Sequence, residues 1–224
     1  MTAHEIDLGE IDPSGAIAEA AHRVSRRGFL AGAAGAAGVA AGLPGAALGK
    51  ESRKTDIEIL NFALTLEYLQ AAFYTEAERL KALGTVGAEA AKKIGAVERA
   101  HVTALQHALG PAATLGPLFD FRGATEDDDA FLRTAVAFED LGTAAYKQQL
   151  TRISTPAYIS AAASIHTVEA RHAAWIRYIA GVQPAVDALD DPISDAEAQR
   201  LVAGTGFTRP RPQTTARTPP PFTG

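Results

Sequence analysis

Hydrophobic residues recur every three to four positions along most of the chain between residues 55 and 204, a pattern that predicts amphipathic helices. Capping residues, glycines and prolines divide this stretch into four long helices and a short fifth helix. The predicted helices span residues 55–83, 87–109, 125–153, 155–181 and 194–204. No segment alternates between apolar and polar residues as a β-strand would, so the sequence predicts an all-α fold.

The connections between the helices predict how they pack. Short connections near residues 84–87 and 153–155 make the first two helices and the last two long helices antiparallel hairpins. Residues 110–126 form a longer loop that can extend over about 55 Å at roughly 3.3 Å per residue. A helix of about 25 residues is only about 38 Å long. The sequence therefore predicts a four-helix bundle with a long crossover between helices two and three, which run parallel.

Local signals also predict the helix starts. Thr55 and Asp56 are candidate caps for the first helix, Thr125 begins a Thr-x-x-Asp capping sequence for the third, and Ser194 precedes the fifth. The acidic run at residues 126–129 is expected to be a charge cluster that the dipole of the third helix favours.

The first 49 residues have the composition of an export signal. Arg26 and Arg27 precede an uncharged stretch, residues 28–49, that consists mostly of alanine and glycine. A twin arginine before such a stretch resembles a Tat export signal, which implies a periplasmic or extracellular protein. Seven glycines make the stretch a poor membrane helix, so we expect no stable membrane anchor after cleavage. An uncleaved anchor and an Ala/Gly linker are the alternatives.

Proline-rich sequence follows the fifth helix and predicts an extended tail. The predicted domain organisation is therefore a signal segment at residues 1–49, a helical bundle at residues 50–204, and a tail at residues 205–224.

Composition narrows the possible chemistry. The chain contains no cysteine, which excludes disulfides, thiolate zinc sites, cysteine-ligated iron–sulfur clusters and cysteine nucleophiles. Its formal net charge of −5 argues against a nucleic-acid partner. A hydrophobic content of 47% is sufficient for a buried core.

Each long helix carries a glutamate in the middle of its apolar stripe, and helices two and four add a histidine three residues later on the same face. These residues are Glu67, Glu98, His101, Glu139, Glu169 and His172, and we call the four carboxylates among them the seam glutamates. Burying one unpaired carboxylate costs several kcal/mol, and four at one level of a bundle would repel one another. Two divalent metal ions would balance the four negative charges, with the imidazoles as neutral nitrogen ligands. The six residues are therefore candidate metal ligands.

The candidate ligands form a degenerate internal repeat. The interval from Glu67 to Glu139 is almost the same as the interval from Glu98 to Glu169. In helices one and three a tyrosine lies two turns after the glutamate, on the same face, at Tyr74 and Tyr146. Two Glu-x-x-His sequences in register with two further glutamates favour one shared metal site over isolated core residues.

This doubled pattern resembles the ferritin-like di-metal carboxylate bundle of bacterioferritins and rubrerythrins. Residues 56–69, DIEILNFALTLEYL, closely resemble the exported ferritin-like family that includes plant desiccation-related proteins. The resemblance implies that Glu98 and Glu169 bridge two metal ions and that each histidine binds one ion. It further implies that Glu67 and Glu139 are terminal ligands.

The resemblance also makes Tyr74 and Tyr146 candidate catalytic residues, as hydrogen-bond or redox partners of the metal site. One residue departs from the family pattern. Gly142 stands three residues after Glu139, where rubrerythrins carry an additional glutamate. Rubrerythrin-type peroxidase chemistry is therefore not carried over to this chain.

Four carboxylates and two imidazoles without a thiolate suit two Fe ions, or alternatively Mn. The expected activity is redox chemistry on dioxygen, peroxide or ferrous ion, of the ferroxidase or catalase/peroxidase type. Two alternatives stay open: a non-catalytic stress- or desiccation-related envelope protein with a structural or vestigial metal site, and an iron-storage cage. Oligomerisation is possible with any of them.

Several other residues with metal-binding or ionic side chains lie off these apolar stripes. We expect His107 and His166 to be non-ligating, Arg99 and Arg171 to form salt bridges at the surface, and Trp175 to pack.

Overall fold

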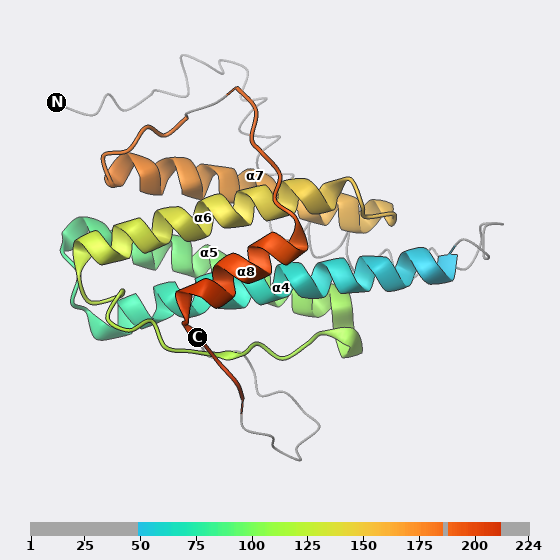
Figure 1. The fold of residues 1–224 in the computed structure, drawn as a ribbon, viewed down its shortest axis with the longest axis horizontal. Helices are drawn as coiled ribbons and strands as arrows, with labels where there is room; N and C mark the ends of the chain where they lie inside the picture. The colour runs from blue at the N-terminus through green and yellow to red at the C-terminus, as the bar shows by residue number, and fades with distance from the viewer. Residues whose placement is uncertain (1–48, 186–187, 212–224) are drawn as a thin grey trace, which may run out of the picture. The chain divides into compact units, whose positions relative to one another are not determined.

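The computed structural model describes residues 49–185 and 188–211 and shows a bundle of four long helices (Figure 1). These helices are α4 (Gly49–Leu80), α5 (Thr85–Leu109), α6 (Asp128–Leu150) and α7 (Pro156–Ile179). The shorter elements are the 3₁₀ turn η1 (Gly110–Ala112), strands β1 (Leu118–Phe119) and β2 (Thr208–Arg209), and helix α8 (Asp195–Thr205). The all-α bundle with a short C-terminal helix is confirmed.

Most of the predicted signal segment, residues 1–48, and the last part of the predicted tail, residues 212–224, lie outside the described residues. Within the described ranges, no helix has the length and apolarity needed to cross a membrane.

The predicted caps of two helices were wrong. Asp56 lies inside α4, because the helix begins at Gly49, and its carboxylate accepts hydrogen bonds from the backbone of Ser154 and Thr155. Helix α6 is capped by Asp127, whose Oδ1 accepts from the backbone N–H of Ala130 at 2.8 Å. Asp127 therefore caps its own helix, whereas Asp56 binds the backbone at the start of a neighbouring helix.

Thr125, the predicted cap of α6, instead donates its hydroxyl to Glu76 Oε1 at 2.9 Å. The cap of α8 is confirmed, because Ser194 Oγ accepts from the backbone N–H of Glu197.

Carboxylates near the starts of α4 and α6 fix the helix directions. Asp56, near the start of α4, binds the turn that follows α6, where Ser154 and Thr155 donate at 2.9 Å. Asp128, at the start of α6, accepts from Gly84 N–H beyond the end of α4, at 3.0 and 3.1 Å to its two oxygens. Helices α4 and α6 are therefore antiparallel, and α5 and α6 run parallel as predicted.

The crossover from α5 to α6 runs along α4, as the loop length predicted (Figure 1). Asn61 of α4 donates to Ala112 O at 3.0 Å and accepts from Thr114 N–H at 2.8 Å. The Tyr68 hydroxyl of α4 donates to Thr114 O at 3.1 Å. The loop is therefore attached to α4 over its first half.

The sequence did not predict the two short strands. Leu118 pairs with Arg209 and Phe119 with Thr208 in an antiparallel ladder, and Asp120 N–H donates to Phe207 O at 2.9 Å. Strands this short cannot show an alternating pattern. The first residues of the predicted tail are thus paired with the crossover loop.

Aromatic rings fill the end of the bundle where the crossover joins α6. Phe73 of α4 stacks on Phe131 at 5.2 Å between ring centroids and meets Phe121 and Phe138 edge to face. Phe207 also contacts Phe121 edge to face. Edge-to-face and offset-stacked pairs add stability beyond the area that they bury. This cluster fixes α4, α6 and the loop against one another beside the four seam glutamates.

Candidate metal centre

The six candidate ligands converge in the middle of the bundle. All four glutamates are fully buried, and the two histidines are 8% exposed. Their ligand atoms form two overlapping groups, and within each group all atoms lie within 4.8 Å of one another. One group is Glu67, Glu98, His101 and Glu169, and the other is Glu98, Glu139, Glu169 and His172. Glu98 and Glu169 are common to both groups.

The helical period explains this convergence. Residues three apart on a helix lie on the same face, so each Glu-x-x-His sequence directs both side chains into the bundle. The four helices then bring their seam glutamates to one level.

On one side of the cluster, three carboxylates surround His101. Its Nδ1 lies 3.2 Å from Glu67 Oε2, 3.4 Å from Glu98 Oε2 and 3.2 Å from Glu169 Oε1. On the other side, His172 Nδ1 lies 2.8 Å from Glu98 Oε1 and 3.5 Å from Glu139 Oε2.

Apart from these close histidine–glutamate contacts, the buried atoms have no hydrogen-bond partner within the described part of the chain. The unpartnered atoms in the cluster are Glu67 Oε2, both oxygens of Glu98, His101 Nδ1, Glu139 Oε2, Glu169 Oε1 and His172 Nδ1. A buried polar atom without a partner costs about 1–3 kcal/mol, and more when it is charged. A cation removes this cost by accepting their lone pairs. The residues therefore fit a metal centre, and oxygen with imidazole nitrogen is a donor set that Fe and Mn accept.

The metal-free cluster holds protons. Burial raises the pKa of Glu67 to about 7, an effect that the positive charge of His101 partly offsets. Burial also raises the pKa of Glu139. For the histidines, burial alone would lower the pKa, but the surrounding carboxylates outweigh it and raise the pKa of His172 to about 10 and that of His101 well above its usual value. Metal ions must displace these protons to bind.

Two tyrosines support the outer glutamates across the bundle. Tyr146 of α6 donates to Glu67 Oε1 of α4 at 2.6 Å, and Tyr74 of α4 donates to Glu139 Oε1 of α6 at 2.5 Å. Burial raises the pKa of both phenols, and the negative carboxylates raise it further. Both hydroxyls therefore stay protonated as donors. The structure thus brings both candidate tyrosines to the cluster, in contact with glutamates.

Sequence reasoning missed the role of Gln70. Its Nε2 donates to Glu169 Oε2 at 3.0 Å, and the side chain is 2% exposed. Gly142 provides the space for this contact, since a Cβ built there would lie 2.6 Å from Glu169 Oε2. The available signal was a polar amide three residues after Glu67, on the same face of the helix.

Four residues off the apolar stripes lie outside the cluster. Arg99 forms the expected ion pair, with Glu78 Oε1 at 2.8 Å. Trp175 packs against the core and carries Lys93 over its ring at 5.8 Å. His107 is exposed, and neither it nor the half-buried His166 belongs to either group of ligand atoms.

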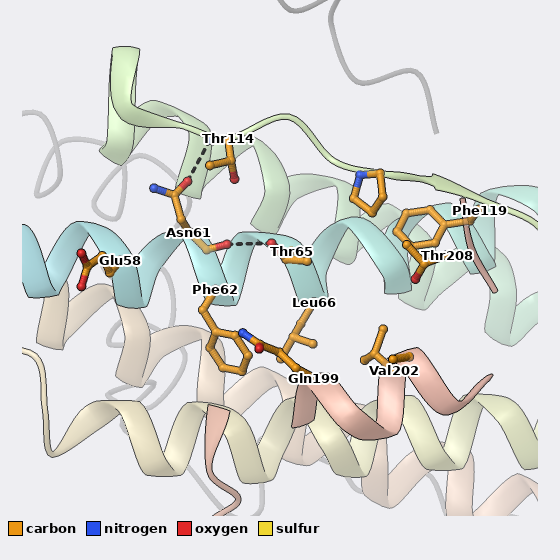
Figure 2. A pocket seen from close by; sticks show the side chains of 12 residues that line it. Glu58, Asn61, Phe62, Thr65, Leu66, Thr114, Phe119, Gln199, Val202 and Thr208 are labelled. Carbon is orange, nitrogen blue, oxygen red and sulfur yellow. Dashed lines mark hydrogen bonds between the residues drawn. The ribbon is translucent and has the colours of Figure 1, made fainter. Parts of the chain in front are cut away.

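A hollow of about 460 Å³ lies between α4, the crossover loop and α8, with Glu58, Leu66 and Gln199 among its lining residues (Figure 2). None of the six candidate ligands lines it. The hollow is therefore separate from the buried cluster.

Comparison with protein families matches residues 55–182, more than half of the chain, to the ferritin-like domain. The match covers all six candidate ligands and both tyrosines. A search of curated proteins finds no match.

Proposed function

The chain belongs to the ferritin-like family, and from this premise we propose that it is an exported oxidoreductase with a dinuclear Fe or Mn centre. The observation that carries the proposal is the set of buried, unpartnered ligand atoms from four glutamates and two histidines. Such atoms are costly to bury in a protein that never binds a cation. When bound, a pair of Fe or Mn ions supplies one-electron and two-electron redox chemistry on dioxygen or peroxide.

The ligands have separate roles in this proposal. Glu98 and Glu169 belong to both groups of ligand atoms and would bridge the two ions. Glu67 with His101, and Glu139 with His172, would complete the two sides.

The histidines lie where the cluster comes nearest to solvent. Their side chains are 11% and 10% exposed for His101 and His172, whereas the glutamate side chains that they face are 0% exposed. A small oxidant or a ferrous ion would therefore reach the cluster between α5 and α7, beside the two imidazole rings. The negative charge of the carboxylates favours the entry of cations on that route.

Tyr74 and Tyr146 act as positioning residues in this account, because their hydroxyls contact Glu139 and Glu67. Each phenol fixes one carboxylate oxygen and leaves the other oxygen directed at the histidine side of the cluster. Such partners hold a ligand in its binding orientation before the ion arrives. The same hydrogen bond also gives each phenol a carboxylate that can accept its proton if the ring is oxidised.

The reactions that fit best need no second cofactor, because nothing in the chain resembles a flavin or nicotinamide site and an exported protein has no cytosolic reductant. They are oxidation of ferrous ion by dioxygen or peroxide, and disproportionation of two peroxide molecules to dioxygen and two water molecules.

The test combines metal analysis with both assays. Protein purified from its own host is expected to contain about two Fe or Mn ions per chain and to oxidise ferrous ion or to release dioxygen from peroxide. Glu98→Gln should abolish the activity, while Glu78→Gln, which alters the ion pair with Arg99 outside the cluster, should retain it. Bound metal without either activity would favour a structural site in a stress-related envelope protein. A native mass of many subunits would favour iron storage.

Export is tested separately. Replacing Arg26 and Arg27 by lysine should leave the precursor in the cytoplasm, because the Tat receptor reads the arginine pair. Undiminished export of this double variant would remove the Tat assignment without affecting the metal site.

A further inference from the structure

The two sides of the cluster differ in how many of their prospective ligand atoms are unpartnered. When a carboxylate bridges two ions, each of its oxygens serves one ion. Glu98 meets this condition on both sides, since Oε2 lies near His101 and Oε1 near His172. Glu169 Oε1 lies near His101, which leaves Oε2 for the His172 side. The cluster thus contains eight prospective ligand atoms, and seven of them are unpartnered among the described residues.

The eighth atom is Glu169 Oε2, which accepts a hydrogen bond from the Gln70 side chain. A carboxylate accepts hydrogen bonds and does not donate them, so the amide nitrogen of Gln70 must face this oxygen, at 3.0 Å. An oxygen that already accepts a hydrogen bond gives less electron density to a cation. An ion beside His172 would share this oxygen with the Gln70 amide, whereas an ion beside His101 would meet only unpartnered atoms.

The internal repeat shows why the His101 side of the cluster lacks a donor that matches Gln70. Gln70 follows Glu67 by three positions, and the equivalent position after Glu139 is occupied by Gly142. Glycine leaves the space in which Gln70 meets Glu169, since a Cβ at position 142 would lie 2.6 Å from Glu169 Oε2 and 3.2 Å from Gln70 Nε2. It also provides no donor to Glu98. The difference between Gln70 and Gly142 therefore creates both the contact with Glu169 and the asymmetry between the two sides of the cluster.

We propose that the Gln70 and Gly142 pair makes the two ion sites unequal, so that the site beside His101 fills first and the site beside His172 fills second. This inference rests on the dinuclear centre proposed above. It assigns Gln70 as a positioning residue that sets the order of metal loading through Glu169. Stepwise loading would let the second site exchange its ion while the first stays filled.

The first test is a titration of the metal-free full chain with Co²⁺, followed by the visible absorption of the bound ion and by calorimetry. Wild type is expected to show two separate binding events. His101→Ala should remove the tighter event, and His172→Ala should remove the weaker one. A single event with two equal sites, or loss of the tighter event in His172→Ala, would overturn the inference. Absence of all Co²⁺ binding would instead overturn the dinuclear centre itself.

The second test changes the donor. Gln70→Leu should tighten the weaker event by roughly 10–100-fold, the range that corresponds to one hydrogen bond to a charged group that no longer competes with the ion, and should leave the tighter event nearly unchanged. Gln106→Leu is the matched control, because Gln106 donates to the Tyr68 hydroxyl outside the cluster at 2.8 Å. An unchanged ratio of the two affinities in Gln70→Leu would overturn the inference.

A double variant tests the role of Gln70 in a second way if Gln70→Leu does not fold. The double substitution Gln70→Gly with Gly142→Gln moves the amide to the other hairpin, where the repeat directs it toward Glu98 Oε2. The site beside His172 should then fill first. Retention of the original order in a folded double variant would contradict the role of Gln70.

Discussion

The α4–α5 hairpin and the α6–α7 hairpin contribute equivalent candidate ligands but differ in the residues beside them. Each hairpin contributes two seam glutamates, one histidine and one tyrosine, and the interval between equivalent residues is nearly constant along the chain. The repeat also includes residues outside the cluster. Asp56 and Asp128 are separated by the same interval as Glu67 and Glu139, and each binds backbone N–H groups at the start of a helix in the other hairpin.

Two differences between the hairpins, both beside the cluster, occur where packing decides the residue. Phe73 has Ala145 as its equivalent, and Gln70 has Gly142. Phe73 belongs to the aromatic cluster at one end of the bundle. Its equivalent in the other hairpin, Ala145, has no ring. The six candidate ligands and the two tyrosines thus follow the repeat because both halves contribute to one cluster, while the residues beside them differ with the local space.

The largest effect is expected from replacing either of the two glutamates that belong to both groups of ligand atoms. Glu98→Gln or Glu169→Gln should reduce bound metal from about two ions per chain to nearly none, because each carboxylate belongs to both groups of ligand atoms. Metal-dependent stabilisation, about 2.7 kcal/mol at a free metal concentration of 100 times Kd, should disappear with it. Elemental analysis and thermal melts measure both. Retention of one ion would show that the two hairpins bind independently.

The second prediction concerns pH. In the metal-free protein, Glu67 has a folded pKa of about 7 against 4.5 for the free group, and His172 about 10 against 6.5. The folded state therefore binds more protons than the unfolded chain, so its stability should fall, by roughly 8 kcal/mol at most, as pH rises from about 5 to about 10. Glu67→Gln should flatten the lower part of this curve, between about pH 4.5 and 7.

The metal-bound protein should show the opposite slope. Its ligands must be deprotonated, so acid competes with the ions and stability falls as pH drops. Thermal melts of both forms at several pH values should give curves that converge at low pH. Parallel curves would indicate that the glutamates do not share a buried site.

A smaller effect is expected from the tyrosines, one from each hairpin. Tyr74→Phe and Tyr146→Phe remove the donors to Glu139 and Glu67. Each should weaken one ion by about 10–100-fold, because the carboxylate loses its fixed orientation. Tyr68→Phe, which alters a tyrosine that binds the crossover loop, is the control and should leave metal affinity unchanged. A metal titration of the three variants checks this, and equal behaviour of all three would contradict the positioning role.

The smallest expected effect compares the two aspartates. Asp56 is fully buried and accepts from two backbone N–H groups, whereas Asp128 is exposed and accepts from one. Asp56→Ala should cost about 1–2 kcal/mol and Asp128→Ala about 0.5–1 kcal/mol of unfolding free energy. Asp129→Ala, at another exposed position, should stay within about 0.5 kcal/mol. Urea unfolding measures all three, and a larger loss for Asp128→Ala would contradict the assigned partners.

The sequence was sufficient for the helices and for the residues that meet in the cluster. Helical periodicity places Glu98 and His101 on one face whatever the partners are, and loop lengths limit the topology to a long crossover. These features depend on local rules that act over one or two turns.

The remaining features depend on residues far apart in the chain. Gln70 contacts Glu169 across 99 positions, and only because residue 142 has no side chain. Asp56 was expected to cap its own helix, yet its partners lie 98 and 99 residues away. A polar side chain that can bind several N–H groups does not reveal which one it binds until the helices are packed.

The most direct test of the metal centre is anomalous X-ray diffraction from crystals of the metal-loaded protein, recorded at the Fe and Mn absorption edges. The account predicts two peaks inside the bundle, one beside His101 and one beside His172, with Glu98 and Glu169 contacting both. Peaks only at the protein surface, or no peak among these residues in crystals grown with excess metal, would contradict it.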